Sequence, residues 1–288
     1  GPISSCGFGN FPNMANPLLN DKAMNQAANR GWAASEADAG KQQTGTWAPP
    51  ISDGPVSPWV STARMTASGA ISATLVLMVL LLAAGVFGWS AVKEPVAGQV
   101  QFPGWVIAGI IVALIAAFGA MFKPNLARFL APVYAIAEGL VVGAISHAYN
   151  IQYDGIVLQA VGATAGVFTV MLVLYRTGII RVNDKFRRIV IGATMGLVVF
   201  YAVAFLFSLF GVDVSFFNNG SLLGIGLSLF AAGLAAANLA MDFDFIEQGE
   251  RNGLPKQMEW YAAIGVMVTL VWLYLELLRL FANLRERN

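Results

Sequence analysis

The chain has 288 residues, of which 57% are hydrophobic and only 11% are charged, and its mean hydropathy is +0.65. Soluble domains are about half apolar and about a quarter charged, so this composition predicts an integral membrane protein. The net charge is +1, and the Lys and Arg residues are spread through connecting segments. No basic surface for nucleic acid is therefore expected.

The first thirteen residues, GPISSCGFGNFPN, precede Met14 and contain the only cysteine, Cys6. A Gly-Pro start is typical of a protease-cleavage scar, so residues 1–13 are interpreted as added or upstream sequence. Disulfide and metal-thiolate sites are then not expected, because no cysteine remains.

Residues 14–66 are rich in Asn, Ala, Gly, Ser, Thr and Pro and have no sustained apolar period. Such a segment cannot bury enough apolar surface to offset its ordering entropy, which predicts a disordered cytoplasmic tail. It does not have the pattern of a signal peptide. The alternative is a partner-docking segment that uses Trp32, Trp47 and Trp59.

From residue 67 onward, apolar runs of about the length that spans hydrocarbon alternate with short polar breaks. The seven runs cover residues 67–89, 103–122, 129–149, 156–175, 189–210, 222–241 and 258–281. Unsatisfied backbone is costly in lipid, so runs of this length must be helices rather than strands. The sequence therefore predicts an all-α bundle of seven transmembrane helices over residues 67–288.

The orientation is predicted from the basic residues in the connections. The connections after the second, fourth and sixth runs carry nine Lys and Arg residues, whereas those after the first, third and fifth carry only Lys93. The N-terminus is therefore expected in the cytoplasm and the C-terminus on the opposite side of the membrane. Arg279 in the last run and Arg285 and Arg287 after it oppose this crossing. The last helix is expected to cross despite these charges, with an incomplete crossing as the alternative.

Pairs of glycines at four-residue spacing allow helix backbones to approach closely. A tight monomeric bundle is favoured over dimerisation. The pairs are Gly139 and Gly143, Gly162 and Gly166, and Gly192 and Gly196.

Four carboxyl groups are expected at membrane depth, namely those of Glu138, Asp242, Asp244 and Glu276. Intramembrane ionisable residues are by default candidates for function. Glu138 is expected about 13 Å inside the membrane, at 1.5 Å per helical residue. Asp242 and Asp244 fall at the inner end of the sixth run, where Asp242 is the functional candidate and Asp244 is expected to face water.

Glu276 has Arg279 three residues later, so an ion pair near the outer interface is one interpretation. It lies eighteen residues after the cytoplasmic start of the last run, about 27 Å. This distance is too large for a partner of Asp242, which is expected near the inner side of the membrane. His147, the only histidine, is expected to have a capping or interfacial role, with pH sensing as the alternative.

The enzyme classes that operate inside membranes are not favoured. No membrane-level Gly-x-Ser-x-Gly motif is present, and one histidine cannot form His-Glu-x-x-His. Gly224-Ile225-Gly226 is followed by Leu227 rather than by the aspartate of an intramembrane aspartyl protease. The protein is therefore expected not to be an enzyme and to need no cofactor.

Three motifs resemble those of the Bax inhibitor-1 family, the transmembrane Bax inhibitor motif proteins with bacterial YccA-type members. The sixth run ends in DFDFI, residues 242–246, and the last run contains LYLE, residues 273–276, followed by LFANL, residues 280–284. Gly139 followed by Ala144 is similar to the small-residue pattern of the third helix. The resemblance covers residues from about Met65 to the end.

The resemblance implies a central last helix and a pH-sensitive calcium leak that is gated by a carboxylate pair. That pair corresponds to Asp242 and Glu276, with Glu in place of the family's Asp, and the basic latch has its nearest match in Lys123. The two carboxyl groups are then expected within about 5 Å of each other. The depth of Glu276 agrees with this if the last helix begins near Ile264.

A coupled carboxyl pair can titrate as one unit, and two carboxylates form a hard oxygen site that suits a transient calcium ion. If Asp242 and Glu276 do not meet, Glu259 or Glu138 is the next partner. Two other functions stay open: a stress regulator that binds partners such as a membrane protease, and a proton-coupled transporter.

Overall fold

The computed structural model describes residues 64–92, 103–210 and 221–287. The chain divides into two units, Gly1–Val60 and Ser61–Asn288, and all described residues belong to the second. The predictions for residues 1–13 and for the tail up to residue 63 therefore lie outside the described residues.

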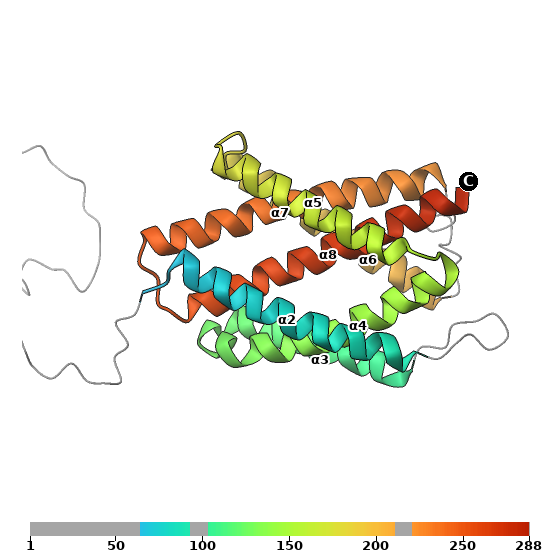
Figure 1. Cartoon of the computed structure of the whole chain (residues 1–288). Helices are drawn as coiled ribbons and strands as arrows, with labels where there is room; N and C mark the ends of the chain where they lie inside the picture. The colour runs from blue at the N-terminus through green and yellow to red at the C-terminus, as the bar shows by residue number, and fades with distance from the viewer. Residues whose placement is uncertain (1–63, 93–102, 211–220, 288) are drawn as a thin grey trace, which may run out of the picture. The chain divides into compact units, whose positions relative to one another are not determined.

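The described residues form helices and no strand, apart from one isolated bridge between Arg64 and Pro255. Seven of the helices are long and apolar enough to cross a membrane, which confirms the predicted all-α, multi-pass architecture (Figure 1). They are α2 (Ala67–Ala91), α3 (Gly104–Phe122), α4 (Ala127–Gln152), α5 (Ile156–Arg176), α6 (Asp184–Leu209), α7 (Leu222–Arg251) and α8 (Met258–Arg287), with a 3₁₀ turn, η1 (Pro124–Leu126), before α4.

Consecutive helices run antiparallel (Figure 1). We call the end of the bundle with the turn between α7 and α8 the turn end, and the opposite end, where α8 finishes, the C-terminal end. The α5–α6 connection and the first residues of α2 are also at the turn end.

Helices α7 and α8 extend beyond their predicted limits, to Arg251 and Arg287. The predicted end of α7 coincided with the charged residue Asp242, but the helix continues through the charged residues that follow, of which Asp244 and Glu247 have partners on α6 and α5. Both helices have 30 residues, about 45 Å at 1.5 Å per residue. Charged positions near the predicted ends therefore lie well inside the helices.

Helix α8 is the core of the bundle, which confirms the predicted central last helix. It contacts α2, α3, α4, α5 and α7, and 72% of its most apolar stretch is buried, against 11% for α5 and for α6. Its apolar side chains pack in two clusters, one with α2 and α4 and one with α5 and α7. A polar group on α8 is therefore held among other helices rather than exposed to lipid.

Helices α2 and α4 are in close backbone contact at glycines. A Cβ atom at Gly143 would overlap the carbonyl oxygen of Gly85, and one at Gly88 would overlap that of Leu140. The predicted packing role of Gly139 and Gly143 is thus confirmed. It is wrong for the other two pairs, since a Cβ would meet no atom within 4 Å at Gly162, Gly166, Gly192 or Gly196.

We expect Gly143→Ala to lower the free energy of unfolding by about 1–3 kcal/mol, the usual effect of overpacking. Backbone atoms of Gly85 would have to move to admit the methyl group. Thermal unfolding in detergent measures this effect. The matched control is Gly166→Ala on α5, where nothing lies within 4 Å. Equal losses of stability in the two variants would contradict the glycine contact.

Candidate functional site

Asp242 lies on α7, nine residues before the end of that helix, and faces α8. A Cβ atom at Gly265 would lie 3.5 Å from Oδ1 of Asp242, so the missing side chain of Gly265 makes room for the carboxyl group. The Thr269 hydroxyl is within hydrogen-bonding reach of this carboxyl group. Its Oδ2 atom is buried and has no hydrogen-bond partner in the described part of the chain.

Glu276 is 3% exposed and belongs to a buried polar cluster between α6 and α8. The Tyr201 hydroxyl donates to its Oε1 atom at 3.1 Å, and Arg279 lies 3.5 Å from Oε2. Arg279 also donates to the Tyr201 hydroxyl at 2.9 Å, and its guanidinium lies 5.1 Å from the centre of the Tyr201 ring. The predicted ion pair with Arg279 is therefore present; its carboxylate is buried, whereas the Arg279 side chain is 33% exposed.

The predicted contact between Asp242 and Glu276 is wrong. Gly265, which lies beside Asp242, is eleven residues before Glu276 on the same straight helix, about 16 Å along its axis. Even a fully extended glutamate side chain leaves the carboxyl groups more than about 5 Å apart. Each carboxyl group instead has its own partners.

A late start of the last helix does not explain the position of Glu276. Helix α8 begins at Met258, as the apolar run predicts, and not near Ile264. It continues to Arg287, so Glu276 lies eleven residues before its end, about 16 Å. The length of α8 beyond the predicted limit therefore places Glu276 near the middle of the helix.

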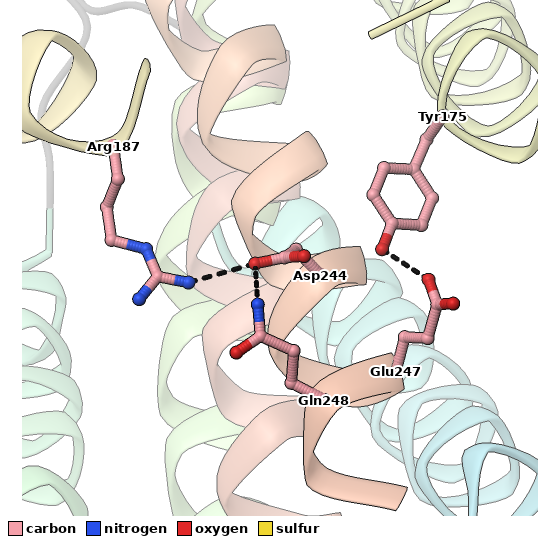
Figure 2. Close-up of polar contacts among 5 residues, drawn as sticks. All are labelled: Tyr175, Arg187, Asp244, Glu247 and Gln248. Atoms are coloured by element: carbon pink, nitrogen blue, oxygen red, sulfur yellow. Dashed lines mark hydrogen bonds and ion pairs between the residues drawn. The ribbon is translucent and has the colours of Figure 1, made fainter. Parts of the chain in front are cut away.

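Asp244 is buried rather than exposed to water, which corrects the sequence prediction. It is 8% exposed, and Arg187 of α6 donates to its Oδ2 atom at 2.9 Å. Gln248, one turn further along α7, donates to the same oxygen at 2.6 Å (Figure 2). The carboxyl group of Asp244 is therefore neutralised by α6, which is the reason it can be buried.

A second polar contact at the turn end joins α5 to α7. The Tyr175 hydroxyl donates to Glu247 (Figure 2). Glu247 also forms an ion pair with Arg251. Together with the pair of Arg187 and Asp244, this contact attaches both α5 and α6 to the last turns of α7.

Glu259 has a structural role at the start of α2 and is not a partner of Asp242 in the described contacts. Its Oε1 atom accepts hydrogen bonds from the backbone N–H of Thr66 at 3.1 Å and from the Thr66 hydroxyl at 3.0 Å. Glu250 accepts from the N–H of Ala67 at 3.2 Å. Met65, 1% exposed, is inserted next to Gly249. The last residues of the predicted tail are thus ordered against the α7–α8 turn.

The remaining predicted residues lie apart from these clusters. Glu138 is half-buried on α4, one turn after Tyr134, and Lys123 is exposed at the α3–η1 turn. None of the three ion pairs among the described residues involves Lys123, so the proposed latch has no anionic partner there. His147 packs against Trp89 with ring centres 4.9 Å apart.

Sequence reasoning missed the residues of α6 that contact the carboxyl groups. Arg187, Thr194 and Tyr201 recur every seven residues and so lie on one face of α6. Arg187 contacts Asp244, Tyr201 contacts Glu276, and Thr194 accepts a hydrogen bond of 2.9 Å from Asn238 of α7. This seven-residue spacing of polar residues was the available signal.

The described residues contain no group of three or more His, Cys, Asp and Glu side chains that could hold a metal ion. Calcium takes six to eight oxygen ligands, and Asp242 and Glu276 are too far apart to share one ion. The arrangement is therefore two separate carboxyl groups on the α7–α8 pair rather than one shared site.

A comparison with family models matches residues 16–286 to the family described as Bax inhibitor 1 like. The match begins about fifty residues before the stretch on which the resemblance was based, and it includes most of the predicted tail. No curated protein matches the chain. Because the family match covers nearly the whole sequence, the chain belongs to the Bax inhibitor 1 like family of membrane proteins.

Proposed function

We propose that the protein is a cation leak pathway, with calcium as its main ion, whose conductance depends on the protonation of Asp242. The observation that carries this proposal is the Oδ2 atom of Asp242. This atom is buried on α7, a helix long enough to span a membrane, and it has no hydrogen-bond partner among the described residues. A charged carboxylate in that position needs a cation or water beside it, whereas a protonated one does not. Loss of the proton from Asp242 is thus coupled to the arrival of a cation beside its carboxylate.

Asp242 and Glu276 act in series in this proposal rather than as one pair. A cation passes Asp242 near the turn end and then Glu276, about 10–16 Å further along α8. Calcium interacts with each carboxylate transiently, and no resident metal or other cofactor is needed.

The proposed location is a plasma (inner) membrane, with the turn end and the N-terminus in the cytoplasm. The basic residues of the α5–α6 connection and of the α7–α8 turn are at this end, which is the pattern of cytoplasmic connections. We propose no enzymatic activity.

The test is calcium entry into liposomes that contain the purified protein and a calcium-sensitive dye, at about pH 5.5 and about pH 7.5. We expect the wild-type rate to differ between the two conditions. Asp242→Asn, which keeps the shape but cannot ionise, is expected to remove this difference.

Asp184→Asn is the matched control, because Asp184 is exposed in the first turn of α6. It should keep the wild-type rates at both pH values. A calcium rate in Asp242→Asn that still changes with pH as in the wild type would refute the role of Asp242. Saturable uptake of an organic solute instead of calcium would favour a proton-coupled transporter.

A further inference from the structure

One side of α8 is polar along much of its length. Thr269, Trp272, Glu276, Arg279 and Asn283 follow each other at spacings of three or four residues, which places them on one side of the helix. We call this side the polar face of α8. From Thr269 to Asn283 it extends about 21 Å, most of the roughly 30 Å of a hydrocarbon core.

Buried polar atoms without a hydrogen bond concentrate on this face and on the facing part of α7; one of them, Oε2 of Glu276, has only the 3.5 Å ion pair with Arg279. Among the described residues, five buried side-chain polar atoms have no hydrogen-bond partner, and four of them belong to Ser228 and Asp242 of α7 and Glu276 and Asn283 of α8. Ser228 is fourteen residues before Asp242, so in the antiparallel pair it lies about level with Arg279. Buried polar atoms are normally paired, often with water. Water is the partner that these atoms would take if this face of α8 were opened.

Helix α6 meets the polar face of α8 and the facing part of α7 through polar contacts. Arg187 binds Asp244, Thr194 binds Asn238, and Tyr201 binds both Glu276 and Arg279. These contacts are spaced at seven-residue intervals along α6 and thus run from the turn end toward the C-terminal end. Each of these polar contacts can be replaced by hydrogen bonds to water at a small net cost in free energy.

The apolar attachment of α6 is weak. Only Val190 and Leu197 are buried among its described side chains. In the described part of the chain, α7 is the only helix whose backbone lies close to that of α6. In contrast, α2 and α4 are in direct backbone contact at their glycines. The bundle therefore combines a tightly packed part, α2, α4 and α8, with one loosely attached helix.

We propose that α6 is the moving wall of the ion path: its displacement from α7 and α8 opens the polar face of α8 to water and small cations. This inference rests on the proposed function and extends it, because it assigns the gating movement to α6 and adds Ser228 and Asn283 to the path. In the structure, Tyr201 and Arg279 both contact Glu276, so a cation reaches this carboxylate only after Tyr201 has moved away with α6.

The first experiment ties α6 to α7. Thr194→Cys and Asn238→Cys are combined in a Cys6→Ser background, because the two original side chains are 2.9 Å apart at their polar atoms. The shortest bifunctional methanethiosulfonate reagent then links the two thiols in the reconstituted full chain. Removal of a minor open state, commonly about 0.1–10% of molecules, is expected to reduce calcium entry at least about tenfold, and reductant should restore it.

The two single-cysteine variants are the controls and should keep their flux after treatment with the same reagent. Cross-linked protein that conducts as well as the reduced protein would overturn the role of α6. Asp242→Asn, measured in parallel, separates the two proposals: if it alters flux while the cross-link does not, the ion path stands and the moving wall fails.

The second experiment does not depend on calcium flux. Ser228→Cys in the Cys6→Ser background is treated with a small cationic methanethiosulfonate, and modification is followed by mass spectrometry. We expect modification at Ser228→Cys, and faster modification when Tyr201→Phe and Arg187→Gln weaken the attachment of α6. Ala131→Cys, equally buried but on α4, is the control and should stay unmodified. Equal rates with and without the two α6 substitutions would overturn the proposal.

Discussion

Replacing Glu276 by leucine is expected to lower the free energy of unfolding by about 3 kcal/mol, the low end of the range for removing one partner of a buried ion pair, because the Arg279 side chain is 33% exposed. Arg279 would then be held inside the bundle without its carboxylate, and the Tyr201 hydroxyl would lose an acceptor. Leucine has nearly the same volume, so cavity formation contributes little. The measurement is unfolding by denaturing detergent in mixed micelles.

The double variant Glu276→Leu with Arg279→Leu distinguishes a charge effect from a packing effect. A buried ion pair replaced by apolar residues is often neutral or stabilising, so the double variant should recover most of the lost stability. Arg287→Leu, an exposed position near the end of the same helix, is the control for loss of a positive charge. A double variant as unstable as Glu276→Leu alone would show that the cluster is held by shape rather than by charge.

Reversing the charge of Arg187 is the second large effect that we expect. Arg187→Glu places two carboxylates beside each other where Asp244 is buried, and it removes the 2.9 Å contact that attaches the first turn of α6. Because the side chain of Arg187 is 45% exposed, solvent reduces the effect, and we expect a loss of about 2 kcal/mol. Thermal unfolding in detergent provides the measurement.

The adjacent Arg188 is a close control for this substitution. It is exposed and has the same chemistry, so Arg188→Glu gives the same change in net charge and should leave stability nearly unchanged. Exchanging the two charges, with Arg187→Asp and Asp244→Arg together, should recover part of the loss. If Arg187→Glu is as stable as Arg188→Glu, then α6 is not held by this pair.

The helices were predictable from the sequence because length and apolarity are properties of single segments. Each of the seven expected runs lies in a helix of the structure. Their ends were less predictable, because a charge stops an apolar run whether or not a distant residue neutralises it. Asp244 illustrates this: its burial depends on Arg187, 57 residues earlier in the chain, and no local pattern reports that partner.

Part of the candidate site could also be predicted, because it too depends on a property of single segments. Asp242 and Glu276 were found because carboxyl groups in apolar helices are rare. Their separation was not predictable, since it depends on the register between α7 and α8, which Gly265 fixes by leaving space for Asp242. The glycine pairs show the same limit: Gly139 and Gly162 occur in equivalent patterns, but only Gly139 faces another helix.

The hydrogen bonds between Thr66 and Glu259 connect residues 193 positions apart, which has a consequence for the order of assembly. During synthesis, α2 leaves the ribosome long before α8 exists, so its first turn enters the membrane without the acceptor that later caps it. The first crossing helix is completed only when the last one arrives. A chain that stops before Glu259 is therefore expected to present an unfinished N-terminal helix to the quality-control machinery of the membrane.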